Sequence, residues 1–161
     1  MTAIAAVSHR GRVWMASDSR VGTNAWAHEL GESKVTIARD DLLVGHAGSS
    51  AERVLRAVDW DAQDLALEID RHIKRLDMQG DADFELLIGR GGKLWYYDGR
   101  TVWPCADRYA SIGSGSLVCL GYLAATPGVP PQDRVRGAVR AAITHVPTCG
   151  GKIWVHSCHA A

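Results

Sequence analysis

Short apolar, β-branched runs alternate along this chain with segments of helical periodicity, and this order is the strongest constraint on its fold. Residues 2–8 and 12–17 are strand-like and are joined by a tight turn, as in a hairpin. Residues 34–39 and 42–48 repeat the pattern around an Asp-Asp turn. The first third of the chain therefore predicts two β-hairpins.

The periodicity then changes from two residues to three or four. Residues 51–58, with Ser49 as N-cap, and residues 61–76 predict two helices. The remaining expected elements are strands at 84–88, 93–97 and 101–104, helices at 116–125 and 132–146, and a closing strand at 152–158. Each amphipathic helix must bury its apolar stripe on a sheet face. The order thus predicts an α+β fold, a four-layer α-β-β-α sandwich with two antiparallel sheets between helix layers.

Length and charge limit the classes of protein that this chain can belong to. Its 161 residues, with no linker-like segment, predict a single domain spanning 1–161. Equal numbers of basic and acidic residues, 18 of each, give no electrostatic footprint for nucleic acid or an anionic membrane. No apolar run approaches the roughly 20 residues of a membrane-spanning helix, and the four cysteines lack CxxC spacing. We therefore expect a cytoplasmic protein that binds neither nucleic acid nor membrane.

Thr2 follows the initiator methionine directly. A small second residue normally allows Met1 to be removed, which would leave a threonine with a free α-amine. Such a residue can serve as both nucleophile and base. The ordinary pKa of an α-amine is about 7.7 to 8.0, so a nearby cation that lowers it leaves much of the amine neutral at physiological pH. Because many unrelated proteins begin Met-Thr, the terminus alone is not specific.

The residues downstream of Thr2 have a characteristic spacing. Asp18 lies 16 residues after Thr2 and Lys34 lies 32 residues after it, while Gly48 ends a predicted strand and residues 112–115 read Ile-Gly-Ser-Gly. Together these features resemble the proteasome β-subunit and HslV family of N-terminal-nucleophile hydrolases, in a bacterial or phage homologue. The resemblance covers most of the chain.

The resemblance implies catalytic roles for five residues. The Thr2 hydroxyl would attack the scissile carbonyl, with Lys34 stabilising the developing alkoxide and Asp18 keeping the lysine protonated and oriented. The Gly48 N–H would form the oxyanion hole, and Ser114 would bond to the threonine amine and help move its proton. Simpler readings stay open: an ordinary ion pair at two strand ends, a strand-to-helix turn, and a helix-capping serine.

The resemblance also places a substrate pocket on five positions of this chain. These positions are Val21, Glu32, Thr36, His46 and Ser50. The set is polar and partly acidic, which favours substrates with a polar or basic residue before the cut over large aliphatic ones.

The turn ahead of the last predicted strand departs from the proteasome pattern. Proteasome β-subunits carry a serine at the position of Cys149. HslV-like chains, by contrast, also have a cysteine in this region. By resemblance, a structural monovalent or divalent cation would bind the backbone carbonyls of Val146, Cys149 and Lys152. No other cofactor is expected.

Three hypotheses of function follow from these features. The first is a threonine-type endopeptidase that degrades unfolded polypeptide inside stacked hexameric or heptameric rings of its own copies, with an unfoldase ATPase partner left open. The second is a proteolytically silent, ring-forming structural or assembly homologue. The third is an amidase of the same fold acting on a small amide. Retention of Met1 would favour the silent protein, and peptide turnover would favour the first.

Overall fold

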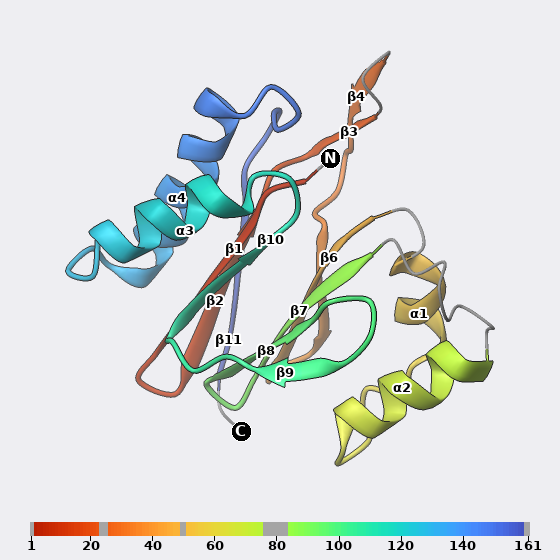
Figure 1. Ribbon diagram of the computed structural model, residues 1–161. Coiled ribbons are helices and arrows are strands. Elements are labelled where there is room, and N and C mark those ends of the chain that lie inside the picture. The colour runs from red at the N-terminus through yellow and green to blue at the C-terminus, as the bar shows by residue number, and fades with distance from the viewer. Residues whose placement is uncertain (1, 23–25, 49–50, 76–83, 160–161) are drawn as a thin grey trace.

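The computed structural model describes residues 2–22, 26–48, 51–75 and 84–159, and Figure 1 shows the arrangement of their helices and strands. Within these ranges four helices accompany two larger antiparallel sheets and one small sheet. No helix in this part of the chain is long and apolar enough to cross a membrane.

The first sheet has the strand order β10-β1-β2-β11, and its central hairpin leads directly from Thr2. Its strands are β1 (Ile4–His9), β2 (Arg12–Ser17), β10 (Tyr109–Ile112) and β11 (Trp154–Cys158). The β1–β2 turn places Arg10 at φ 48° and Gly11 at φ 75°, as the two-residue turns that match strand twist require. The hairpin register pairs Ile4 with Ser17. Asp18 is thereby brought beside the chain segment that precedes β1.

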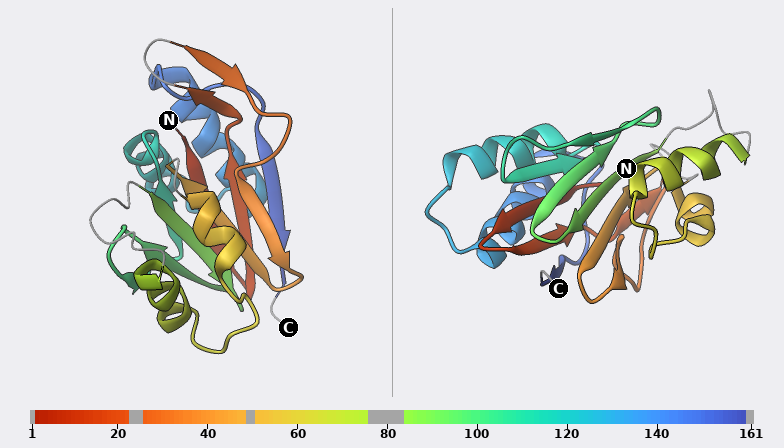
Figure 2. Two further views of the ribbon diagram at one scale, coloured as in Figure 1. Left: turned by 90° about the vertical axis from the view of Figure 1, so that its right-hand side faces the viewer. Right: turned by 90° about the horizontal axis from the view of Figure 1, so that it is seen from below.

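The second sheet has its strands in sequence order. They are β5 (Val35–Arg39), β6 (Leu42–Ala47), β7 (Glu85–Arg90), β8 (Lys93–Tyr97) and β9 (Val102–Pro104). A separate small sheet pairs β3 (Arg20–Gly22) with β4 (Ala27–Glu29). Figure 2 shows this β3–β4 hairpin projecting beyond the end of the larger sheets at which the N-terminus lies.

Two pairs of helices flank the sheets. Helices α3 (Ser116–Ala125) and α4 (Pro131–His145) lie against the first sheet, and α1 (Ala51–Ala57) and α2 (Leu65–Arg75) lie beside the second (Figure 1). Pro131 occupies the first turn of α4, where its missing N–H costs no helical hydrogen bond.

Three apolar clusters hold these elements together: one between the first sheet and α3 and α4, one between the two sheets, and one between the second sheet and α1 and α2. Representative members are Val7, Leu123 and Val139 in the first, Ile4, Leu43 and Leu87 in the second, and Val44, Val54 and Ile69 in the third. Successive side chains of a strand point to opposite faces. Consequently Leu43 and Val44 enter different clusters, and residues 42–44 at the start of β6 form a continuous apolar run.

The predicted α+β class and antiparallel sheets are confirmed, with differences at individual elements. Helix α2 begins at Leu65 rather than at residue 61, because the Asp64 carboxylate accepts a hydrogen bond from the Leu67 N–H (3.0 Å) and caps the helix there. Strands β3, β4 and β10 were not predicted, since each is only three or four residues long. The expected cap at Ser49 lies outside the described residues.

Leu43 is fully buried between the two sheets, whereas Leu117 on α3 is 83% exposed. We expect Leu43→Ala to lower the free energy of unfolding by about 2 to 5 kcal/mol, through lost burial and the cavity left behind. Leu117→Ala, the matched control, is expected to change it by less than about 0.5 kcal/mol. Urea denaturation measures both. Equal losses in the two variants would contradict the packing described.

Candidate active site

Thr2 lies just ahead of β1, only 5% exposed, against the turn that connects β10 to α3. This turn, residues 113–115, holds the threonine backbone on both sides: the Thr2 N–H donates to Ser114 Oγ (3.1 Å), and the Gly115 N–H donates to the Thr2 carbonyl (3.0 Å). Gly113 has φ +85°, and a Cβ on it would lie 2.4 Å from the Thr2 carbonyl oxygen. Only glycine therefore allows this approach.

A buried ion pair lies on the other side of the same chain segment. Lys34 Nζ is 2.6 Å from Asp18 Oδ1, and the two side chains are 3% and 0% exposed. The same Asp18 oxygen accepts the Ala3 N–H (3.0 Å), and its second oxygen accepts the Gly150 N–H (3.1 Å). The Asp18 carboxylate thus bridges Lys34 and Ala3, the residue after Thr2.

The protonation of Lys34 is set by two opposing effects. Burial lowers the pKa of Lys34 below its ordinary value, and the charge and hydrogen bond of Asp18 act against that shift. Lys34 Nζ also donates to the Arg20 carbonyl (2.5 Å). The ammonium group is therefore oriented by two acceptors at the ends of β2 and β3, which makes it a fixed charge rather than a mobile surface lysine.

Ser114 is the point where three segments meet. Its hydroxyl accepts the Thr2 N–H and a hydrogen bond from Thr148 Oγ1 (3.0 Å), and Cys149 Sγ lies 3.8 Å from it. Burial raises the pKa of the Cys149 thiol, so this sulfur is held as a neutral thiol rather than as a nucleophilic thiolate. In this cluster the hydroxyl groups, not the cysteine, are the groups suited to proton transfer.

Gly48 follows β6 and has φ +98°, a left-handed conformation that favours glycine. The end of β6 is fixed beside the ion pair, because the His46 N–H donates to the Lys34 carbonyl (3.1 Å). The end of β6, which Gly48 follows, therefore lies beside Lys34. Its use as an oxyanion-hole donor stays a prediction.

The predicted substrate-pocket residues lie around the same lysine. Val21 is on β3, next to the Arg20 carbonyl that Lys34 contacts, and Thr36 is exposed on β5, two residues after Lys34. Glu32 is exposed two residues before Lys34. Ser50 lies outside the described residues.

His46 completes this group from β6. Burial lowers the pKa of His46, against the opposing charge of Glu52, so the ring is held neutral over a wider pH range than an exposed histidine. Its Nδ1 is buried and has no hydrogen-bond partner among the residues that the structure describes. A neutral, polar side chain thus lines the space beside Lys34.

The proposed cation loop is fixed to the end of β2. The Gly150 carbonyl accepts the Ser19 and Arg20 N–H groups (3.2 and 3.1 Å), and the Lys152 N–H donates to Ser19 Oγ (2.7 Å). The Val146 carbonyl accepts the Cys149 N–H (2.9 Å), so a cation would have to use its second lone pair. In the part of the chain that the structure describes, no three or more His, Cys, Asp or Glu residues form a metal-binding group. The carbonyl site at Val146, Cys149 and Lys152 stays a prediction.

Sequence reasoning missed several residues that support the site. Ser17 Oγ accepts the Lys34 N–H (3.3 Å), and Ser19 and Thr148 bond as described above. The run Ser17-Asp18-Ser19 was a visible signal, because short hydroxyl side chains beside a buried carboxylate can bind neighbouring backbone groups. Glu85, which accepts the Gly113 N–H (2.7 Å), had no such local signal.

Comparisons with known proteins bear on the fold. No protein-family model matches the sequence, and no curated protein matches it significantly. Among solved structures, Thiobacillus denitrificans BPH in complex with epoxomicin matches with a TM-score of 0.79 and 18% identity over 99% of this chain and 100% of that one. BPH alone gives 0.78 and 18% over 99% of each chain. Eukaryotic HslV from Trypanosoma brucei gives 0.79 and 19% over 98% and 99%. The chain therefore has the fold of HslV and BPH, which confirms the predicted resemblance at the level of the fold.

Asp18→Asn removes the counter-charge of Lys34. We expect it to lower the free energy of unfolding by about 3 to 5 kcal/mol at neutral pH, because it leaves a buried charge unpaired. Since the folded-state pKa of Lys34 is lowered, the penalty of a charged lysine is full below that pKa, falls as pH rises through it, and is gone above the ordinary lysine pKa of the unfolded chain. The deficit relative to wild type should therefore shrink at alkaline pH.

Urea denaturation at neutral and alkaline pH tests this expectation. Asp61→Asn is the control, because Asp61 is 81% exposed in its pair with Arg39 and such pairs contribute about 0 to 1 kcal/mol. A deficit of Asp18→Asn that stays constant with pH would show that Lys34 is not the group left uncompensated.

Proposed function

We propose that this chain is a threonine-type endopeptidase subunit that degrades unfolded polypeptide through an acyl-enzyme on Thr2. One observation carries the proposal: Thr2 lies between the 113–115 turn and the buried Asp18–Lys34 pair, in a chain with the fold of HslV. The complex of BPH with epoxomicin supports it. The three apolar clusters support a four-layer α-β-β-α sandwich that forms one domain over residues 1–161.

The proposed reaction begins with removal of Met1, which turns the Thr2 backbone nitrogen into an α-amine. This nitrogen is 3.1 Å from Ser114 Oγ, within reach for orientation and proton exchange. The neutral amine takes the proton of the Thr2 hydroxyl as its oxygen attacks the peptide carbonyl. The carbon–nitrogen bond then breaks, the ammonium returns the proton to the leaving amine, and an acyl ester remains on Thr2.

Water resolves the ester in the second half of the reaction. The amine removes a proton from water, hydroxide adds to the ester carbonyl, and the Thr2 oxygen leaves and regains its proton. In both halves a negative charge develops on oxygen near Lys34, whose ammonium is held in place by Asp18. A fixed charge of this kind needs no reorganisation when the transition state forms. The Gly48 N–H is proposed as the second stabilising group, at the carbonyl oxygen.

The proposal extends to assembly and location. A peptidase with an open site would endanger its own cell, so we propose stacked hexameric or heptameric rings, in the cytoplasm, with the threonines inside. An unfoldase ATPase is a further proposed partner. A silent ring protein and a small-amide amidase are the competing hypotheses that the experiments below separate.

The substrate preference of the site is predicted from Glu32 and the polar residues around it. We expect kcat/KM for peptides with Lys or Arg before the cut to exceed that for Leu by about tenfold, which corresponds to about 1.4 kcal/mol of differential binding in the transition state. A fluorogenic peptide library measures the ratio. Glu32→Gln should reduce it, and a wild-type profile dominated by Leu would reject the assignment of the pocket.

The nucleophile is tested on the N-terminal residue itself. Thr2→Ala should reduce kcat for peptide cleavage by about 1000-fold or more, because no oxygen remains to form the ester. Thr2→Ser keeps the hydroxyl and the amine and should retain part of the activity. Lys34→Ala should act mainly on kcat rather than KM, since its charge is used as the alkoxide develops.

An epoxyketone such as epoxomicin gives a second, independent readout. It closes a ring only on a hydroxyl with an adjacent free amine, so mass spectrometry should find an adduct on the N-terminal peptide of wild type and none on Thr2→Ala. Cleavage that survives in Thr2→Ala would reject the nucleophile. Wild type that keeps Met1, forms no adduct and cleaves no peptide would favour the silent ring protein, and turnover of small amides alone would favour the amidase.

A further inference from the structure

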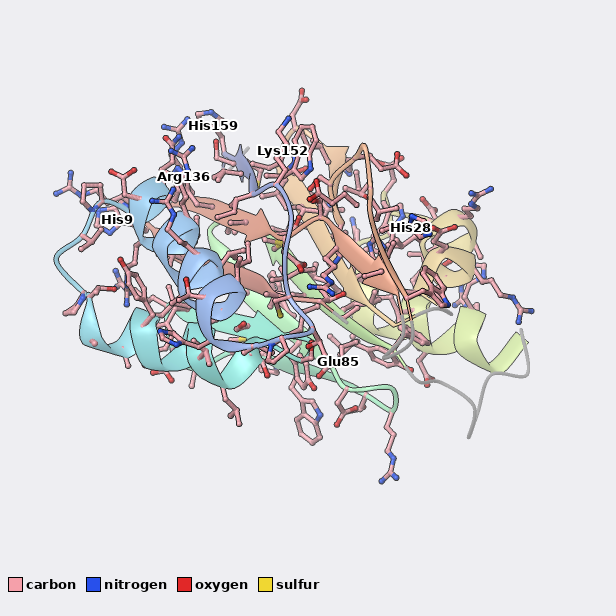
Figure 3. The ribbon with its side chains drawn as sticks, turned by 90° about the horizontal axis from the view of Figure 1, so that it is seen from above. His9, His28, Glu85, Arg136, Lys152 and His159 are labelled. Carbon is pink, nitrogen blue, oxygen red and sulfur yellow. The ribbon has the colours of Figure 1, made fainter. Side chains whose placement is uncertain are left out.

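Glu85 links the second sheet to the turn that holds Thr2. It is the first residue of β7, and its carboxylate is bonded on both oxygens: Oε1 accepts the Tyr96 hydroxyl (2.7 Å), and Oε2 accepts the Gly113 N–H (2.7 Å). Tyr96 is on β8 of the same sheet, whereas Gly113 follows β10 of the first sheet. Figure 3 shows Glu85 beside the N-terminal end of α3. The side chain therefore spans the two sheets at the end where Thr2 lies.

The hydrogen bond to Gly113 acts at a sensitive position. Gly113 approaches the Thr2 carbonyl so closely that no Cβ fits between them, and the next two residues, Ser114 and Gly115, bond to the nitrogen and the carbonyl of Thr2. A shift of the Gly113 peptide would move both of these contacts together. The position of Ser114 relative to Thr2 is thus coupled to the position of Glu85.

Both hydrogen bonds that Glu85 accepts are charge-assisted, because the acceptor is a carboxylate. A hydrogen bond to a charged acceptor is roughly twice as strong as a neutral one. Burial, together with the hydrogen bond to Glu85, raises the pKa of Tyr96, so the phenol stays protonated and continues to donate. With Tyr96 fixing one oxygen, the other presents a carboxylate lone pair to Gly113 in one orientation.

We propose that Glu85 is a positioning residue for the N-terminal threonine: through Gly113 it holds the 113–115 turn so that Ser114 Oγ faces the Thr2 nitrogen. The proposal rests on the function proposed above. Because Glu85 acts through the turn, its loss should impair the chemical step and leave substrate binding intact. A merely structural link between the sheets would instead reduce stability and leave the site geometry unchanged.

Steady-state kinetics of peptide cleavage separate these roles. Glu85→Ala is expected to lower kcat by at least about tenfold with KM unchanged, since small misplacements of catalytic groups have effects of this order. Glu85→Gln keeps an oxygen that can accept the Gly113 N–H and should restore most of the activity. Tyr96→Phe, which leaves Glu85 in place with one bond fewer, should fall between wild type and Glu85→Ala.

Asp41→Ala is the matched control. Asp41 is a carboxylate in the β5–β6 turn of the second sheet, paired with Arg39 (3.1 Å) and Arg90 (3.5 Å). It is buried, whereas Glu85 is half-buried, and it lies at the opposite end of β6. It should lower the melting temperature as Glu85→Ala does and leave kcat unchanged. If the two variants lose activity in proportion to their loss of stability, Glu85 has no positioning role.

Amide hydrogen exchange tests the proposal without relying on activity. The Gly115 N–H donates to the Thr2 carbonyl, and its exchange should become at least tenfold faster in Glu85→Ala but not in Asp41→Ala. Unchanged Gly115 exchange would overturn the positioning role, whatever the kinetics show. Faster exchange in a protein whose wild type neither cleaves peptide nor reacts with the epoxyketone would uphold it and reject the proposed peptidase.

Discussion

The buried pair of Asp18 and Lys34 is the interaction on which the rest of the site depends. A carboxylate that is 0% exposed is tolerated only when its charge is paired and its oxygens are bonded. Here those requirements are met by Lys34, by the backbone of Ala3 ahead of β1, and by the backbone of Gly150 ahead of β11. One side chain thereby fixes three chain segments that are far apart in sequence, and the segment that carries Thr2 is one of them.

A second set of contacts fixes Thr2 from the opposite side, and it uses a hydroxyl group and a backbone N–H rather than charge. The 113–115 turn holds the nitrogen and the carbonyl of the threonine, while Asp18 holds the next peptide. Both sets of contacts are made at the ends of strands, where backbone donors no longer bond to a neighbouring strand. The position of the site is therefore determined by where the strands end. This explains why its residues come from both sheets and from two turns.

Much of this arrangement could be predicted from the sequence because its signals are local or lie at fixed distances from Thr2. The apolar runs of β1 and β6 predict buried strands, and the offsets of Asp18 and Lys34 from Thr2 identify two residues that the structure joins at 2.6 Å. The link between Glu85 and Gly113 could not be predicted. It joins residues 28 positions apart in different sheets, and neither partner lies in a pattern that specifies the other.

The hydrogen bonds around Ser114 come from a threonine and a cysteine that are neighbours in the chain, Thr148 and Cys149. A thiol is a weak donor and a weak acceptor, so Cys149, whose sulfur makes a long hydrogen bond of 3.8 Å with Ser114 Oγ, is a weaker partner than a hydroxyl. The preceding residue supplies one instead, since Thr148 Oγ1 donates to Ser114 Oγ at 3.0 Å. Ser114 then directs its own proton to the Thr2 carbonyl (3.3 Å) and its lone pair to the Thr2 nitrogen. The order of donors around Ser114 is thus set by the turn geometry, with Thr148 rather than Cys149 as its short-range donor.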